Sequence, residues 1–241
     1  MPRFFCPQPL EIGLVFDLPA PLAHHLQVLR LAPGAVVTLF NGEGGEFTAT
    51  VSAIEHKSVT VEIKAFSARE AELPYAITLA QALPEASKMD WIAEKAAELG
   101  AAGLQPLAAQ RCVVRLSGER AEKRVLHWRA IAIAAAEQSG RNRIMHVAEP
   151  VGFDRYVAQQ DLHLRIVLTP DAEMTLGQWA RHQPPQSVAL MVGPEGGFSA
   201  TELARTGTHG VLALSVGQRI LRTETAGLAA LAALNAVWGE M

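Results

Sequence analysis

From about residue 71 onward, short apolar runs that read as strands alternate with segments that have the spacing of amphipathic helices. One helical segment begins near Ser87, a candidate cap, and stops at Gly100; a second covers residues 119–138. The strand-like runs read YAITLAQAL, GLQPL, LRIVLT, SVALMV and VLAL. Because strands that are joined through helices usually pair in parallel, this alternation predicts an α/β fold with a parallel sheet covered by helices.

The first 64 residues have a different pattern, with little helix. Three β-rich runs, AVVTLF, EFTATVSAI and SVTVEIK, are separated by the turn sequences NGEGG and HK, and LAHHLQVLRL is the one helical interruption. This spacing predicts a small β-barrel or sandwich, with NGEGG forming a hairpin. The polar stretch Ser67–Pro74 marks a boundary, so we expect two domains, residues 1–70 and 71–241.

Composition favours an ordinary soluble protein. Of the 241 residues, 49% are hydrophobic, which is enough for a good core. The two cysteines, Cys6 and Cys112, have neither a disulfide framework nor metal-type spacing, so we expect no metal and a cytoplasmic location. Prolines interrupt the N-terminal apolar residues too early for a signal peptide, and the longest apolar run, AGLAALAAL, is too short to span a bilayer.

Charge is distributed unevenly along the chain. The formal net charge is −3, but residues 111–143 hold eight basic and three acidic residues, a net charge of +5, so the remainder carries −8. A basic segment on an acidic protein fits a polyanionic partner that binds one face. It equally fits a solvated helix with internal ion pairs, such as Glu119 with Lys123 at i and i+4.

The stretch VGPEGGF, residues 192–198, places three glycines and a proline directly after an apolar strand. A helix start follows, because Ser199 can cap the helix while Glu202 completes a capping box. Glycine allows positive φ and close approach of a ligand. Two other strands end in similar turns, TPDAEM and SVGQRILRTETAG. Since ligands bind beyond the carboxyl ends of strands in such sheets, we expect a pocket built largely of backbone, able to bind an uncharged ring such as adenine.

Other common sites find no support. The sequence has no G-x-G-x-x-G after its first strand and no phosphate-binding P-loop motif. No Ser-His-Asp arrangement has supporting spacing, and His24 and His25 are expected to be surface or packed residues.

Five ordered blocks resemble the ribosomal RNA small-subunit methyltransferase E family of the SPOUT superfamily. They lie between Gln81 and the C-terminus and read QALPEASKMDWIAEKAAELG, QRCVVRLSGERAEKR, AAEQSGRNR, GPEGGFSATEL and GQRILRTETAGLAAL. HHLQVLRL and LFNGEGGEF extend the likeness more loosely into the N-terminal domain. Val216 stands where the family commonly has leucine.

The resemblance implies an enzyme that uses S-adenosyl-L-methionine to methylate N3 of one uridine in 16S rRNA, near the decoding centre. It also implies an N-terminal PUA-like β-barrel that binds RNA, a C-terminal domain with a deep trefoil knot, and a homodimer. The substrate would be 16S rRNA within the small ribosomal subunit, with no DNA or membrane partner. The matching cofactor-binding residues are Leu168, Thr169, Gly193, Gly196, Gly197, Ser215, Gly217, Ile220 and Leu221.

Methylating N3 of a uridine requires removal of a weakly acidic proton, so the site needs a base or a cation that stabilises the developing anion. Arg222 is the candidate for anion stabilisation, and Glu224 for proton abstraction or for orienting the arginine. The alternative is an Arg–Glu pair that only caps the last helix. Glu195 is expected to brace its own turn.

The basic segment supplies the candidate RNA contacts, which are Arg111, Arg115, Lys123, Arg124, Arg141 and Arg143. The last helix, residues 224–238, is alanine-rich, and its apolar residues favour core packing over self-association. Two rival functions stay open: a SPOUT methyltransferase with another RNA target, such as a ribose 2′-OH, and a non-catalytic ribosome-assembly factor.

Overall fold

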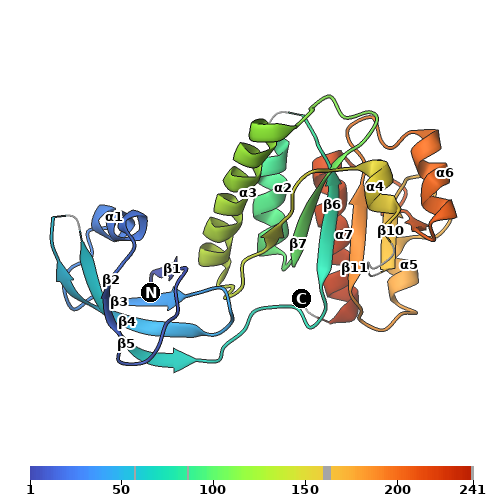
Figure 1. The fold of residues 1–241 in the computed structure, drawn as a ribbon. Coiled ribbons are helices and arrows are strands. Elements are labelled where there is room, and N and C mark those ends of the chain that lie inside the picture. Colours follow the sequence, from blue (N-terminus) through green and yellow to red (C-terminus); the bar gives the residue numbers. More distant parts are fainter. Residues whose placement is uncertain (57, 86, 160–163, 240–241) are drawn as a thin grey trace. The chain divides into compact units, whose positions relative to one another are not determined.

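The computed structural model describes residues 1–56, 58–85, 87–159 and 164–239. The chain forms two compact units, one of Met1–Glu72 with Ala136–Ile144, the other of Leu73–Ala135 with Met145–Met241 (Figure 1). The sequence division at residue 70 did not anticipate that residues 136–144 return to the first unit.

The first unit contains a five-stranded sheet in the order β1-β3-β4-β5-β2. The β3–β4, β4–β5 and β5–β2 pairs are antiparallel, and β1 pairs in parallel with β3. NGEGG joins β3 to β4, which confirms the predicted hairpin. The elements are β1 (Arg3–Phe5), β2 (Val15–Asp17), α1 (Ala20–Val28), β3 (Val36–Phe40), β4 (Glu46–Ile54) and β5 (Val59–Ser67).

The core of the first unit follows the period-2 pattern of its sequence. In β4 the side chains of Phe47, Ala49 and Val51 are buried, while their neighbours are more accessible. Helix α1 buries Leu22 and Leu26 in the same cluster. The buried face of β4 therefore follows the alternation along its sequence.

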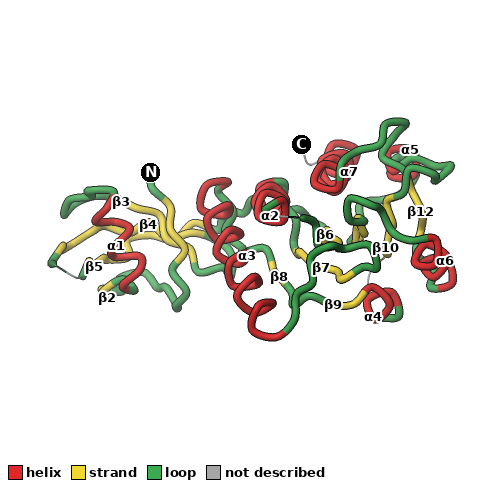
Figure 2. The backbone as a smooth tube through the Cα atoms, turned by 90° about the horizontal axis from the view of Figure 1, so that it is seen from above, coloured by secondary structure: helices red, strands yellow, loops and turns green. Residues whose placement is uncertain are grey.

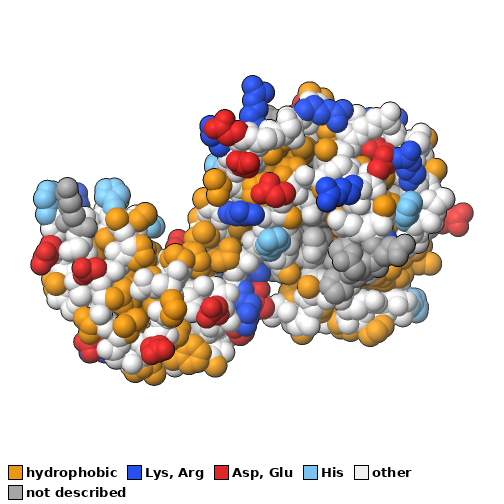
Figure 3. Space-filling view, viewed as in Figure 1, with side chains coloured by type: hydrophobic (Ala, Val, Ile, Leu, Met, Phe, Trp, Pro, Cys, Tyr) orange, Lys and Arg blue, Asp and Glu red, His pale blue; other side chains and the backbone are white. Residues whose placement is uncertain are grey.

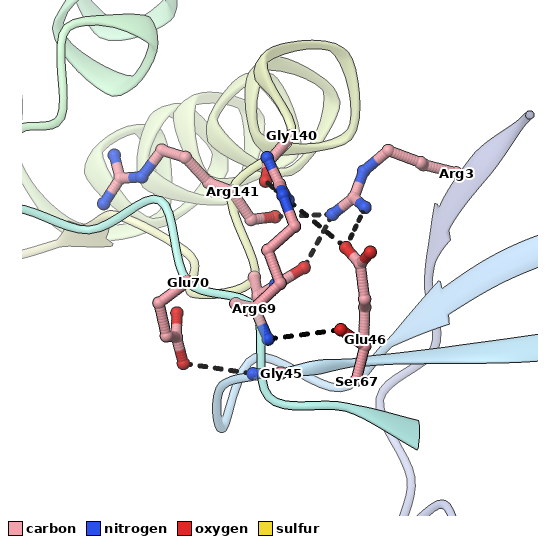
Figure 4. Close-up of polar contacts among 9 residues, drawn as sticks. Arg3, Gly45, Glu46, Ser67, Arg69, Glu70, Gly140 and Arg141 are labelled. Atoms are coloured by element: carbon pink, nitrogen blue, oxygen red, sulfur yellow. Dashed lines mark hydrogen bonds and ion pairs between the residues drawn. The ribbon is translucent and has the colours of Figure 1, made fainter. Parts of the chain in front are cut away.

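A polar network, which we call the Arg3 cluster, joins four segments of the first unit (Figure 4). It consists of Arg3, Glu46, Arg69, Gly140 and Asn142. Arg3 donates to Oε2 of Glu46 at 2.5 Å and to Oδ1 of Asn142 at 2.6 Å. Arg69 donates to the carbonyl oxygen of Gly140 at 2.9 Å, and Asn142 donates to the carbonyl oxygen of Arg69 at 2.6 Å. These bonds tie residues 140–142 to β1, β4 and the end of β5.

The second unit contains a parallel sheet in the order β12-β10-β11-β6-β7-β8, and β9 also pairs with β7. Every residue of β11 is buried, as expected for a strand covered on both faces. The predicted parallel sheet is confirmed. Its strands are β6 (Ile77–Ala82), β7 (Gly103–Ala108), β8 (His146–Val147), β9 (Val151–Gly152), β10 (Leu164–Leu168), β11 (Val188–Val192) and β12 (Leu212–Leu214).

Helices cover both faces of this sheet. Figure 2 shows α2, α5 and α7 on one face and α4 and α6 on the other. The helices are α2 (Lys88–Glu98), α3 (Gly118–Ser139), α4 (Phe153–Val157), α5 (Leu176–Ala180), α6 (Ala200–Thr208) and α7 (Thr223–Trp238). No helix within the described residues is long and apolar enough to cross a membrane.

The helix ends agree with the sequence in most respects. Ser199 and Glu202 form the predicted capping box at the start of α6. Gly100 has φ +87° just beyond α2, so the predicted stop is confirmed. Ser87 occupies the N-cap position of α2 but makes no side-chain capping hydrogen bond, because its backbone (φ −88°, ψ 6°) is not extended as a capping residue's is.

Helix α7 packs against the sheet, as the sequence favoured. Leu228, Leu231, Leu234 and Trp238 are buried. At Gly227 an added Cβ would lie 2.7 Å from Cδ1 of Leu79 on β6, so the helix approaches the strand as closely as glycine allows. This packing places the first turn of α7 beside the carboxyl ends of β6 and β11.

Candidate functional site

Three turns meet beyond the carboxyl ends of β10, β11 and β12 and enclose a cavity of about 520 Å³. Each turn follows a strand, so the site stands where open α/β sheets bind ligands. Of the cofactor-binding residues predicted from sequence, these line the cavity: Leu168, Thr169, Gly193, Gly196, Gly197, Gly217, Ile220 and Leu221.

Ser215, the remaining residue of the predicted set, is not among the residues that line this cavity. Its side chain is buried, and its backbone N–H and hydroxyl both point to the carbonyl oxygen of Met174, at 3.0 and 3.4 Å. Its own carbonyl accepts a hydrogen bond from Leu176 at 2.8 Å. Ser215 therefore joins the end of β12 to the start of α5.

The glycine turn, residues 193–198, needs glycine at two positions. An added Cβ on Gly193 would lie 2.9 Å from the backbone nitrogen of Phe198, closer than side chains normally come. Gly197 has φ +66°, a conformation that other residues adopt at a cost. Gly196 is different, because its Cβ would meet only the Arg111 side chain, at 3.4 Å.

Hydrogen bonds from Thr223 and Arg111 hold the glycine turn in place. The hydroxyl of Thr223 donates to the carbonyl oxygen of Gly193 at 2.6 Å and accepts from Nε2 of the buried Gln81 at 2.9 Å. The guanidinium of Arg111 donates to the carbonyl oxygen of Gly196 at 2.7 Å. The turn is thus held by β6, α7 and the segment after β7.

The Glu195 carboxylate ties the glycine turn to a third segment. It accepts hydrogen bonds from the backbone N–H of Glu85 at 3.1 Å and from Nζ of Lys88 at 2.6 Å. Burial alone would raise the pKa of Glu195, but the hydrogen bonds from Lys88 and Glu85 outweigh it and lower that pKa. Glu195 therefore braces its turn, as expected, but does so against the loop after β6.

The two candidate catalytic residues lie at the start of α7. Arg222 lines the cavity, is exposed, and makes no side-chain capping hydrogen bond. Glu224 approaches Lys88 at 3.7 Å, and the described residues hold no ion pair between Arg222 and Glu224. The alternative of an Arg–Glu pair that caps the helix is therefore not observed.

Sequence reasoning missed two cations of this cavity, Lys88 and Arg219. Lys88 opens α2, shortly after β6, and β6 pairs with β11. Arg219 lies within the turn whose neighbours were selected. The position of Lys88 depends on the β6–β11 pairing across more than a hundred residues, which no local pattern reports.

The cavity fits a ligand with an uncharged ring and a charged tail. Its volume is in the range of small-molecule sites. Apolar side chains, turn backbone and charged side chains all line it. The apolar residues include Val192, Leu203, Val216, Leu221 and Ala226. Turn backbone and apolar side chains suit an adenosine, and the charged side chains suit a zwitterionic tail. S-adenosylmethionine has both parts.

The predicted RNA contacts do not form one group. Arg111 is committed to Gly196, and Arg115 donates to the carbonyl oxygens of Ala109 and Gln110 at 3.2 and 3.1 Å. Arg124 and Arg143 are exposed, as is Lys123, which pairs with Glu119 at 2.9 Å. On the face in Figure 3, basic side chains are interspersed with acidic ones.

Arg141 differs from the other predicted RNA contacts, because its side chain is only 4% exposed. Its Nε and Nη2 atoms donate to the two carboxylate oxygens of Glu72, at 3.0 and 2.5 Å. A guanidinium that is buried in a bidentate pair cannot also bind a phosphate at the surface. Arg141 serves the structure of the first unit.

Comparison with known proteins agrees with this geometry. The model of an RNA methyltransferase domain matches residues 71–235, and that of an RNA methyltransferase PUA domain matches residues 18–64. Ribosomal RNA small subunit methyltransferase E of Synechocystis is 34% identical over 89% of this chain and 70% of its own length. The protein of that name from Bacillus subtilis is 29% identical over 98% and 96%.

Solved structures give the same result. Ribosomal RNA small subunit methyltransferase E from Neisseria gonorrhoeae, bound to S-adenosyl methionine, is 36% identical with a TM-score of 0.92, over 99% of this chain and 98% of that one. A Legionella pneumophila structure with bound SAM is 39% identical with a TM-score of 0.91, over 97% and 96%. Together, the fold, the cavity and these matches show that the chain belongs to the ribosomal RNA small subunit methyltransferase E family.

Proposed function

We propose that this protein transfers a methyl group from S-adenosyl-L-methionine to 16S rRNA of the small ribosomal subunit. The observation that carries the proposal is the cavity of backbone turns at the edge of β10, β11 and β12, in a chain of this family. Relatives of the same length and fold have been solved with the cofactor bound.

The cofactor would lie among the three turns, where it supplies an electrophilic methyl group. The backbone of the turns at residues 168–169, 193–198 and 217–221 would bind its ring and ribose. Gly193 and Gly197 allow the tight conformation of the turn, and Leu203 and Val216 add apolar side chains to the cavity wall. Of the predicted set, Ser215 would act only by holding β12 against α5.

We propose N3 of a uridine as the methyl acceptor, on the strength of the family resemblance. Methyl transfer requires that nitrogen to be aligned with the methyl carbon and the sulfur. The N3 proton is weakly acidic, so charge develops on the base as the proton leaves. Arg222, exposed at the rim, would stabilise that charge, and Glu224 would accept the proton.

We propose that the RNA is positioned by phosphate contacts from exposed basic side chains of both units. Lys123, Arg124 and Arg143 have the exposure that such contacts require. Arg111 and Arg115 donate to backbone carbonyl oxygens, so we expect them to contribute less to phosphate binding. We expect no phosphate contact from the buried Arg141.

We further propose that the protein is a cytoplasmic homodimer that acts on the assembled small subunit and that its second unit carries the family's trefoil knot. Closed two-fold symmetry is the commonest arrangement of soluble oligomers. Two chains of 25.9 kDa give a dimer of about 52 kDa. Light scattering at micromolar concentration tests this, and a monomer would contradict it.

Mapping of modified nucleotides in rRNA tests the acceptor. A strain that lacks this protein should lose one 3-methyluridine from 16S rRNA, and the plasmid-borne gene should restore it. Loss of a ribose methyl group would favour another SPOUT activity. An unchanged modification pattern, with no cofactor binding in calorimetry, would favour a non-catalytic assembly factor.

A further inference from the structure

Gln81 lies near the carboxyl end of β6 and is fully buried, although its amide group is polar. Its Nε2 atom donates to the carbonyl oxygen of Ala82 at 3.0 Å and to the hydroxyl of Thr223 at 2.9 Å. The hydroxyl of Thr223 in turn donates to the carbonyl oxygen of Gly193 at 2.6 Å. We call Gln81, Thr223 and Gly193 the Gln81 relay.

The direction of the hydrogen bonds in this relay follows from the groups involved. A carbonyl oxygen can only accept, so the one at Ala82 requires the NH2 group of Gln81, and not its oxygen, on that side. The second hydrogen of the NH2 group goes to the Thr223 hydroxyl. The single hydrogen of that hydroxyl is then left for Gly193. Gln81 therefore makes Thr223 a donor to the glycine turn.

The amide oxygen of Gln81 is buried and accepts no hydrogen bond from the described residues. An unpaired buried oxygen costs stability, because it has lost its water without a replacement. Fold stability alone would favour an apolar side chain of the same length at this position, such as methionine. The glutamine is better explained by what its NH2 group does for Thr223.

Close packing of α7 against β6 and β11 brings Thr223 within reach of both strands (Figure 1). Thr223 opens α7, and Gly227 lies one turn later on the same face. At Gly227 an added Cβ would lie 2.7 Å from Cδ1 of Leu79 on β6 and 3.2 Å from Cγ2 of Val192 on β11. A larger residue at this position would hold the helix away from the strands, and the Thr223 hydroxyl with it.

The Gln81 relay joins two walls of the cavity. Gly193 begins the glycine turn, Thr223 follows the turn at residues 217–221, and both residues line the cavity. The hydrogen bond between them therefore sets the distance between two of the turns that are proposed to hold the cofactor. Gln81 is not among the lining residues, so it acts on a ligand only through Thr223.

We propose that Gln81 and Thr223 are positioning residues of the cofactor site, where the Thr223 hydroxyl holds the Gly193 carbonyl and keeps the two turns at the spacing that S-adenosyl-L-methionine requires. This inference rests on the proposed function. The role of the two residues is in binding, and no chemical step passes through them. Loss of the relay should weaken cofactor binding and leave the protein folded.

Calorimetry with S-adenosylmethionine tests the relay on four variants. Thr223→Val removes the hydroxyl and keeps the shape of the side chain, so cofactor affinity should fall by about tenfold or more. Gln81→Met removes the donor that orients the hydroxyl, and affinity should fall by about fivefold. Because the two residues act through one contact, the double variant should bind no more weakly than Thr223→Val. Thr223→Ser keeps the hydroxyl and should bind within about twofold of wild type.

Urea unfolding separates this role from a purely structural one. Gln81→Met removes the unpaired oxygen together with the NH2 group, so its unfolding midpoint should equal that of wild type. The matched control is Gln105→Met on β7. The Gln105 amide has a similar pattern, with Nε2 donating to the carbonyl oxygens of Pro106 and Glu149 at 3.0 and 2.8 Å, but none of these three residues lines the cavity. This control should keep the wild-type cofactor affinity.

The outcomes separate the inference from the proposed function. Wild-type affinity in Thr223→Val or in Gln81→Met would overturn the relay, and so would losses that multiply in the double variant. A lower unfolding midpoint in Gln81→Met, or an equal loss of affinity in Gln105→Met, would overturn it and assign Gln81 to the fold. Wild-type protein that binds no S-adenosylmethionine would instead overturn the proposed function itself.

Discussion

The cavity of the second unit and the polar groups of the first unit are both built around arginine and glutamate, but they use these residues differently. In the first unit Arg3 pairs with Glu46 and Arg141 pairs with Glu72, and these side chains have little exposure to solvent. In the second unit Arg222 is exposed, and one oxygen of Glu224 lacks a hydrogen bond within the described residues. The first arrangement stabilises a fold, and the second leaves the Arg222 guanidinium available to a ligand.

This difference teaches how a basic motif should be interpreted. Arg141 and Arg143 are two residues apart in the same block, yet the first is 4% exposed and the second 53% exposed. Sequence proximity and charge assigned both to RNA. Burial separates them: Arg143 has only an exposed ion pair with Glu70 at 3.5 Å, whereas the guanidinium of Arg141 is paired in the interior and has nothing to offer a phosphate.

The largest effect on stability should come from loss of the buried pair of Arg141 with Glu72. Arg141→Ala leaves the Glu72 carboxylate without its partner in a mostly buried position, and such losses cost about 3–5 kcal/mol. Urea unfolding followed by circular dichroism measures it. The exposed Lys123→Ala, which breaks the pair with Glu119, is the matched control and should leave the midpoint unchanged. Equal stability of the two variants would remove the distinction drawn here.

The largest effect on activity should come from loss of the exposed Arg222 side chain. Arg222→Ala should slow single-turnover methylation at saturating RNA by about 100-fold or more, because one oriented electrostatic donor is lost where charge develops. Stability and cofactor affinity should change little. A variant that keeps its rate, or loses only RNA affinity, would move Arg222 to the positioning contacts.

Two glycines of the glycine turn should differ in how strongly their replacement weakens cofactor binding. Gly193→Ala places a Cβ 2.9 Å from the nitrogen of Phe198, so cofactor affinity should fall by about tenfold or more. Gly196→Ala meets only the Arg111 side chain, and affinity should change by about threefold or less. Calorimetry with S-adenosylmethionine measures both. A larger loss of affinity in Gly196→Ala than in Gly193→Ala would contradict this role of Gly193.

The smallest effect should come from a single exposed arginine. If Arg143 contacts a phosphate, as we propose, Arg143→Ala should weaken the binding of target and non-target RNA alike and reduce the salt slope by about one unit or less. Binding is measured by fluorescence anisotropy across salt concentrations. A loss confined to target RNA would indicate that Arg143 contacts a base.

Local features of this fold were predictable from the sequence. The strand runs, the capping box at Ser199 and Glu202, and the stop at Gly100 each depend on residues within a few positions of one another. The glycine turn was predicted for the same reason. Burial of Leu231 and Trp238 followed from helical spacing alone.

Features that depend on long-range pairing were not predictable in this way. The pairing of β6 with β11 brings Lys88 to Glu195, which is 107 positions away. Pairing of Arg141 with Glu72 closes over 69 positions. Ser215 has the sequence context of a cavity residue, yet its register with Thr175 turns it toward α5. Spacing reports which residues share an element, but not which elements meet.

Methyl transfer by the purified protein is the direct test of the proposed activity. Small subunits that lack the modification are incubated with S-adenosylmethionine and either wild-type protein or Arg222→Ala, and the rRNA nucleosides are identified by mass spectrometry. The account predicts one 3-methyluridine for each subunit with wild type, and a strongly slowed reaction with Arg222→Ala although the cofactor still binds. A ribose-methylated product, or an undiminished rate in the variant, would contradict it.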